Sequence, residues 1–217
     1  YAESTREYTY TLPTSDGTYT VALGEGIGET IKWNEDLVFT VTLDEGHDQN
    51  APVVKSNGKL VEAEKVSDNT YKYVIRADGE NADEIKAKLN NITAETTINK
   101  YTVDVVKATN EPPPKDASCE LSDAHFETTY GGEVVLTVKL SEGYTQTAPV
   151  LTKGEDDRVE ITLVSTEGNK YTYKLSGVKS DATITVTTKI NEYRVIVYNW
   201  KNEAIFNKDV KHGSTPD

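Results

Sequence analysis

The chain has 217 residues, of which 36% are hydrophobic and 27% charged, and its formal net charge is −13. The length predicts about two domains of ordinary size. Binding to nucleic acids and to anionic membranes needs clustered Lys and Arg, so the acidic balance argues against both. No apolar run reaches the roughly 18 residues of a membrane span, so we expect no membrane insertion.

Neither Met at position 1 nor a signal peptide is present, so we expect a piece of a longer protein. Cys119 is the only cysteine. No intrachain disulfide and no cysteine-based zinc site can therefore form.

A short repeated mark sets the period of the chain. Glu7-Tyr8-Thr9-Tyr10 returns as Lys100-Tyr101-Thr102-Val103 and again as Glu192-Tyr193-Arg194-Val195, at spacings of 93 and 92 residues. This period is typical of an immunoglobulin-like sandwich of about 100 residues. We therefore expect two full β-sandwich repeats and the opening hairpin of a third repeat-like module, at residues 1–99, 100–191 and 192–217.

The first predicted strand of each repeat alternates apolar and polar residues. Tyr19, Val21 and Leu23 are matched to Ala117, Cys119 and Leu121. On this match Cys119 is predicted to be a small buried hydrophobe, and a reactive thiol is the alternative.

Gly24, Gly26 and Gly28 form a glycine run after this strand. A phosphate-binding loop would need the run to open a helix, and Glu25 and Glu29 would repel the anion. We therefore interpret the run as a loop.

The densest repeat covers residues 37–53 and 134–150, where ten of seventeen positions are identical. Alternation of period two predicts a half-buried strand in each copy, followed by a turn at Glu45-Gly46 and Glu142-Gly143. The predicted core pairs are Leu37/Val134, Phe39/Leu136, Val41/Val138 and Leu43/Leu140. Pro52 and Pro149 lack an amide donor, so each belongs at a strand start, an edge or a bulge.

An acidic cluster lies at the first of these turns. Asp44, Glu45 and Asp48 could supply oxygen ligands to calcium. The second repeat has Ser141 and Thr145 at two of these places. The turn chemistry therefore persists without the carboxylates, and calcium binding near Asp44 and Asp48 stays an open alternative.

Later alternating sets predict further strands over Tyr71–Ile75, Tyr171–Leu175 and Ala182–Val186. Between two of them, Asn81 followed by Glu84, with Ile85 and Leu89 on one face, predicts a short helix near 81–90 in the first repeat. Glu111-Pro112-Pro113-Pro114 predicts a stiff extended segment.

Two motifs carry a resemblance to known repeats. Tyr130-Gly131-Gly132-Glu133, with the strand that follows it, resembles tandem immunoglobulin-like repeats of Gram-positive bacterial surface proteins. The segment from Tyr193 to Pro216 resembles the start of a Listeria–Bacteroides (internalin B-type) repeat, with Asn202-Glu203 where that family has glycine at the tip. The resemblance implies a secreted, wall-attached or lipid-anchored parent protein with these modules as stalk or adhesive parts.

The residues that enzymes use are present but not in recognisable patterns. His47, His125 and His212 lack metal-ligand spacing, no Gly-x-Ser-x-Gly string occurs, and no carboxylate pair stands out. We predict no catalytic residues, no cofactor and no metal site. Trp33 and Trp200 are candidate ligand-contact residues because exposed aromatics can stack on sugars, although structural packing is the plainer interpretation of both.

The sequence thus predicts an all-β chain of tandem antiparallel immunoglobulin-like β-sandwiches with a short helix inserted in the first. The expected function is non-enzymatic: an extracellular repeat region of a bacterial cell-surface or cell-wall protein, acting as a stalk or spacer between neighbouring domains. The alternative is an adhesin or carbohydrate-binding module for a host protein or glycan. A Lys–Asn isopeptide cross-link is a further hypothesis, for which no residue set is assigned.

Overall fold

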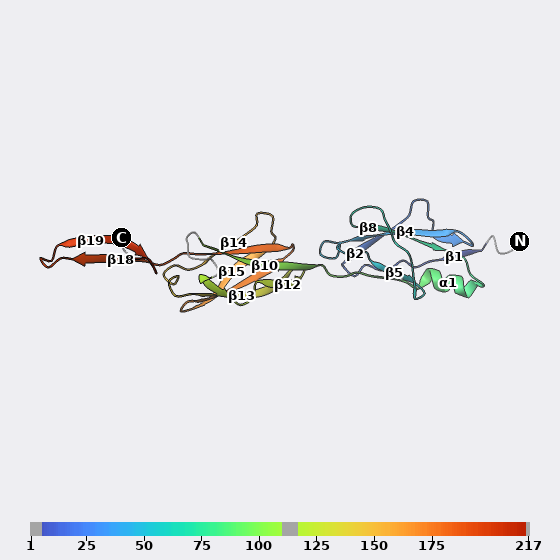
Figure 1. Cartoon of the computed structure of the whole chain (residues 1–217). Coiled ribbons are helices and arrows are strands. Elements are labelled where there is room, and N and C mark those ends of the chain that lie inside the picture. Colours follow the sequence, from blue (N-terminus) through green and yellow to red (C-terminus); the bar gives the residue numbers. More distant parts are fainter. Residues whose placement is uncertain (1–5, 110–116, 216–217) are drawn as a thin grey trace. The chain divides into compact units, whose positions relative to one another are not determined.

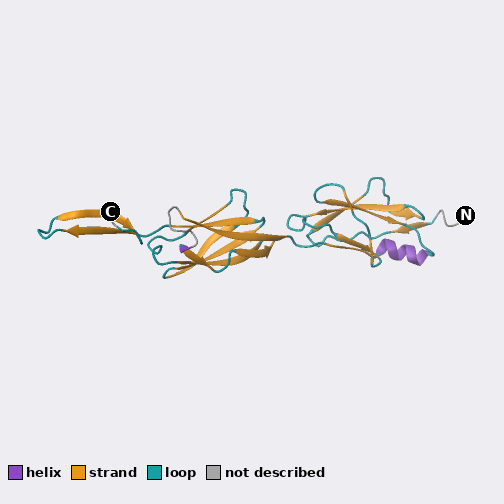
Figure 2. Ribbon diagram, in the orientation of Figure 1, coloured by secondary structure: helices purple, strands orange, loops and turns teal. Residues whose placement is uncertain are grey.

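The computed structural model describes residues 6–109 and 117–215. The predicted proline-rich segment at 111–114 lies outside these residues. The chain divides into two compact units, Tyr1–Asn99 (unit 1) and Lys100–Asp217 (unit 2). The fold is an all-β sandwich fold with one short helix among the described residues, as the alternation predicts (Figure 2).

The described part of unit 1 contains nine strands and the helix, which Figure 1 labels in part. In chain order they are β1 (Glu7–Thr9), β2 (Tyr19–Leu23), β3 (Thr30–Lys32), β4 (Asp36–Leu43), β5 (Val53–Ser56), β6 (Lys59–Leu60), β7 (Glu64–Lys65), β8 (Thr70–Arg76), α1 (Ala82–Asn90) and β9 (Ile92–Glu95). The sheets are ordered β2-β4-β8-β7, β6-β5-β9 and β1-β3.

Within its described residues, unit 2 contains two four-stranded sheets and a hairpin after them. Its strands are β10 (Lys100–Thr109), β11 (Cys119–Leu121), β12 (His125–Thr129), β13 (Gly132–Leu140), β14 (Val150–Lys153), β15 (Glu160–Glu167), β16 (Lys170–Val178), β17 (Ala182–Thr188), β18 (Glu192–Tyr198) and β19 (Ala204–Lys211). The sheets are ordered β11-β13-β16-β15, β12-β10-β17-β14 and β18-β19. The order β11-β13-β16-β15 repeats the order β2-β4-β8-β7 of unit 1 strand for strand.

Each unit buries one core between its sheets, because alternate residues of the strands point inward. Seven of the eight predicted core residues on β4 and β13 are buried. The exception is Val134, which is only partly buried and packs against the core of unit 2. The pairing of β13 with β16 shifts register between Gly132 and Val134, at the start of the strand.

The match of the leading strands is wrong by two residues. Tyr19 pairs with Leu43, and Cys119 pairs with the corresponding Leu140. Tyr19 is therefore the counterpart of Cys119, rather than of Ala117. Both side chains are buried, so the prediction of a buried Cys119 is confirmed.

The helix begins where the sequence predicts. The Asn81 side chain accepts a hydrogen bond from the Glu84 amide at 3.0 Å, and Ile85 and Leu89 are buried in the core of unit 1. Near its end, the Leu89 carbonyl accepts from the Thr11 amide just after β1. In unit 2, where no such helix intervenes, β10 instead pairs in parallel with β17. The insertion of α1 thus accounts for the separate small sheet of β1 and β3.

Candidate functional site

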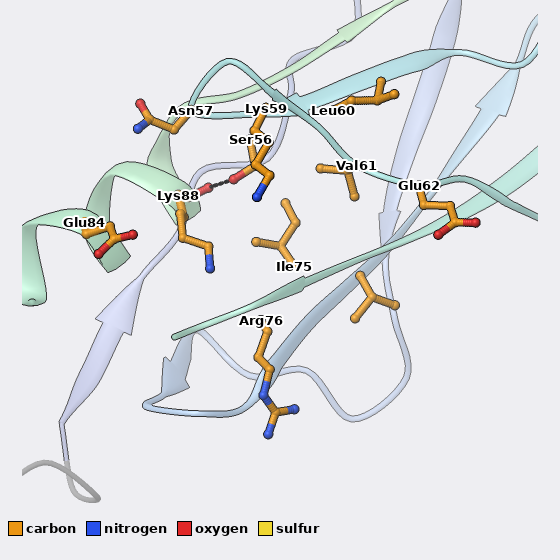
Figure 3. A pocket seen from close by; sticks show the side chains of 11 residues that line it. Ser56, Asn57, Lys59, Leu60, Val61, Glu62, Ile75, Arg76, Glu84 and Lys88 are labelled. Atoms are coloured by element: carbon orange, nitrogen blue, oxygen red, sulfur yellow. Dashed lines mark hydrogen bonds between the residues drawn. The ribbon is translucent and has the colours of Figure 1, made fainter. Parts of the chain in front are cut away.

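Unit 1 has an open groove of about 410 Å³, lined by β5, β6, β8, α1 and the residues that follow β6. Its apolar lining is Leu60, Val61, Val74 and Ile75. Figure 3 shows Ser56 and Lys88 side by side at one end, with Arg76 on the opposite side of β8. The sequence did not indicate this groove, because β6 and α1 belong to separate parts of the chain.

Three of the charged groups of the groove are already paired. Lys88 Nζ donates to Asp78 Oδ1 at 2.5 Å, and this hydrogen bond lowers the pKa of the Asp78 carboxyl below its ordinary value. Arg76 binds Asp36 Oδ1 at 3.1 Å. Glu84 Oε2 accepts from the Glu80 amide at 2.7 Å. These contacts hold the helix and β8 in place.

The Ser56 hydroxyl of the groove also makes a contact within the protein. Ser56 Oγ donates to the Lys88 carbonyl at 2.7 Å, which ties β5 to the helix. The described residues that line the groove include no histidine.

The two predicted aromatic contact residues differ in burial. Trp33 is partly buried, and it packs against the core of unit 1. Trp200 is 88% exposed at the tip of the β18–β19 hairpin, with Lys201 Nζ 5.0 Å from its ring centroid. Because they belong to different units, no surface of a single unit contains both.

Trp200 belongs to a larger exposed set that the sequence analysis did not identify. We call it the hairpin surface; its members are Tyr193, Ile196, Val197, Tyr198, Trp200 and Ile205. The sequence repeat could have indicated part of this surface, because the hairpin has valines where the second sandwich has core valines. Val195 and Val197 match Val103 and Val105, which are 0% and 4% exposed in the core of unit 2. On the hairpin Val195 is half-buried and Val197 is exposed.

The acidic turn of unit 1 has a partner within the protein. Asp48 Oδ1 accepts a hydrogen bond from Asn99 Nδ2 at 2.6 Å. Within residues 6–109 and 117–215, no group of three or more His, Cys, Asp or Glu side chains is placed to hold a metal ion.

Outside the groove, the thiol of Cys119 and the imidazole of His125 are among the groups whose pKa values are shifted. Burial raises the pKa of the Cys119 thiol, which disfavours the nucleophilic thiolate. His125 Nδ1 lies 2.6 Å from Asp104 Oδ1, and this hydrogen bond raises the pKa of the imidazole. The side chains of both members of the pair are more than half exposed.

Comparison with known proteins finds no matching family model and no matching curated protein. None of the helical structure in the described residues has the length and apolar character needed to cross a membrane.

Proposed function

We propose that the chain is a non-enzymatic repeat region of an extracellular bacterial surface protein, and that it acts as a spacer made of immunoglobulin-like sandwiches. The observation that carries this proposal is the construction of one sandwich twice in tandem, each copy with its own core. Such repeats extend a chain without needing a binding site. The bacterial and extracellular parts of the proposal rest on the resemblance of the repeat motifs.

A second function is favoured by the hairpin surface. Exposed aromatic side chains, Trp200 and Tyr198 above all, are common anchors for host proteins and glycans. On this hypothesis the hairpin would be the recognition element of an adhesin, with the sandwiches as its support.

A binding screen distinguishes the two functions. The whole chain is tested against a glycan array and a panel of extracellular matrix proteins, alongside Trp200→Ala. Leu163→Ser on β15 is the matched control, because Leu163 is an exposed apolar residue outside the hairpin. The spacer proposal predicts no saturable binding by any of the three proteins. Saturable binding that Trp200→Ala abolishes and Leu163→Ser retains would contradict it and establish an adhesin.

A further inference from the structure

Each sandwich ends on a buried asparagine that is held by the turn after β4 in unit 1 and by the turn after β13 in unit 2. Asn99 is the last residue of unit 1, and Asn191 follows β17 in unit 2. The backbone amide of Asn99 donates to the Gly46 carbonyl at 2.7 Å, and the backbone amide of Asn191 donates to the Gly143 carbonyl at 2.6 Å. The two side chains are 1% and 3% exposed, so their polar atoms must be satisfied by the protein.

The asparagine side chains make the same contacts in both units. Asn99 Oδ1 accepts from the Gln49 amide at 3.0 Å, and Asn191 Oδ1 accepts from the Gln146 amide at 2.9 Å. The Nδ2 atom of Asn191 approaches Thr145 Oγ1 at 3.4 Å, in the place where Asn99 Nδ2 donates to Asp48. The residue at this position of the turn, Asp48 or Thr145, must accept a hydrogen bond but need not be a carboxylate. This accounts for the change from aspartate to threonine between the repeats.

In unit 2 this turn and the asparagine that it binds together contact both strands of the hairpin. The Glu192 amide, at the start of β18, donates to Gln146 Oε1 at 3.0 Å. Asn191 Nδ2 donates to the Tyr193 hydroxyl at 3.0 Å. Just after β19, the His212 amide donates to the Asn191 carbonyl at 2.8 Å.

The His212 ring closes the junction over Gly143. A Cβ atom at Gly143 would lie 2.3 Å from His212 Cδ2, and Gly143 has a φ of 89°. Only glycine meets both demands, because the φ value lies in the left-handed region and the imidazole occupies the space of a side chain. The His212 ring also contacts the Tyr193 ring, with centroids 6.1 Å apart.

We propose that the Glu-Gly-x-x-Gln turn is a docking socket for an Ile-Asn-x-Tyr segment, through which the second sandwich holds the β18–β19 hairpin as one rigid body with itself. The segment is Ile190-Asn191-Glu192-Tyr193 here, and it recurs as Ile98-Asn99-Lys100-Tyr101. An isolated two-stranded hairpin is only marginally stable in water, so the socket supplies the order that the pairing of two strands lacks. The inference is independent of the proposed spacer role, because an adhesin would need its hairpin held in the same way.

The test compares backbone amide order parameters from NMR relaxation in the whole chain. Gln146→Ala combined with Tyr193→Phe removes the acceptor of the Glu192 amide and the acceptor of Asn191 Nδ2. The backbone amide of residue 146, which donates to Asn191 Oδ1, stays in place. Asn169→Ala is the matched control, because Asn169 Nδ2 donates to the Leu140 carbonyl at 2.8 Å within the sandwich. Tyr193→Phe alone is the milder variant; it deletes the hydroxyl of an exposed side chain and leaves the sandwich intact.

The socket predicts order parameters of about 0.85 for β18 and β19 in the unmodified chain and in Asn169→Ala, as in the sandwich strands. In the double variant the hairpin values fall below about 0.6 while β13 and β16 stay ordered. Tyr193→Phe alone produces a smaller loss in the same strands. A hairpin that is equally ordered in the double variant, equally loosened in Asn169→Ala, or already disordered in the unmodified chain would overturn the proposal.

Discussion

In each unit one tyrosine hydroxyl joins the two sheets by a hydrogen bond, from Tyr73 in unit 1 and from Tyr173 in unit 2. Tyr73 donates to the Pro52 carbonyl at 2.7 Å, and Tyr173 donates to the Pro149 carbonyl at 3.4 Å. The two prolines directly precede β5 and β14, at a strand start as their chemistry predicts. The sequence showed the tyrosine and proline positions repeating, but it could not show that they bond, because the partners lie on opposite sheets.

Tyr73 makes unit 1 sensitive to alkaline pH. Burial raises the pKa of Tyr73 from 10.0 to about 12. Between these values the unfolded chain has lost the proton and the folded chain keeps it, so the free energy of unfolding falls as pH rises from about 10 to about 12. Tyr19, whose pKa is also raised by burial, contributes in the same direction.

We therefore expect Tyr73→Phe to reduce the alkaline loss of stability in unit 1. At neutral pH the same variant costs about 1–3 kcal/mol, because it leaves the Pro52 carbonyl without its partner. Urea unfolding followed by Trp33 fluorescence at pH 8 to 11 measures both effects. Tyr10→Phe is the control: it removes a hydrogen bond to the Gly28 carbonyl but retains Tyr73 and its pH dependence. An unchanged alkaline slope in Tyr73→Phe would refute the assignment.

The rate at which the Cys119 thiol is alkylated reports how often unit 2 opens. Its side chain is 3% exposed, and burial raises its thiol pKa, so alkylating reagents should reach it only when unit 2 opens. We expect labelling by iodoacetamide at pH 8 to be at least about 100-fold slower in the native chain than in urea. Comparable rates in the two conditions would show that β11 is not packed as described.

Period-two alternation predicted β4, β8, β13, β16 and β17 because each of these strands buries one face. It could not predict which strands pair: the parallel contact of β10 with β17 joins residues about 80 positions apart. The leading strands were also mismatched, because short alternating segments fit two registers equally well. Tyr19 and Cys119 share a place in the fold without sharing size or chemistry.

The helix was predictable because its start signal is local. Asn81→Ala removes the acceptor for the Glu84 amide, and we expect it to lower the stability of unit 1 by about 1 kcal/mol. Lys86→Ala, at an exposed position on the same helix, should change stability by less than about 0.5 kcal/mol. Equilibrium unfolding in urea measures both. Equal stability of Asn81→Ala and the unmodified chain would contradict the capping role.

The candidate site was less predictable than the fold. Trp200 was identified as a candidate contact from its residue type alone, whereas the rest of the hairpin surface depends on β18 lacking the cover that β10 receives from the core of unit 2. The closing asparagines had a visible signal, since Ile-Asn precedes the first strand of the second and third modules. The sequence could not show which turn binds these asparagines, because Gly46 and Gly143 are distant from them along the chain.

In the whole molecule, the sequence repeat encodes two separate cores. The buried residues of unit 1 and unit 2 form distinct clusters around β4 and β13. Repeat arrays built in this way unfold locally, because most of the stabilising contacts lie within one unit.

Hydrogen exchange with mass spectrometry on Phe39→Ala in the whole chain measures whether the two cores unfold separately. Phe39 is fully buried and stacks on Tyr73 in unit 1, with ring centroids 5.6 Å apart. Its removal should cost about 3–5 kcal/mol. We predict faster exchange throughout β2, β4 and β8, with exchange in β13, β16 and β17 unchanged. An equal loss of protection in both units would contradict the account and show that the two repeats fold as one cooperative body.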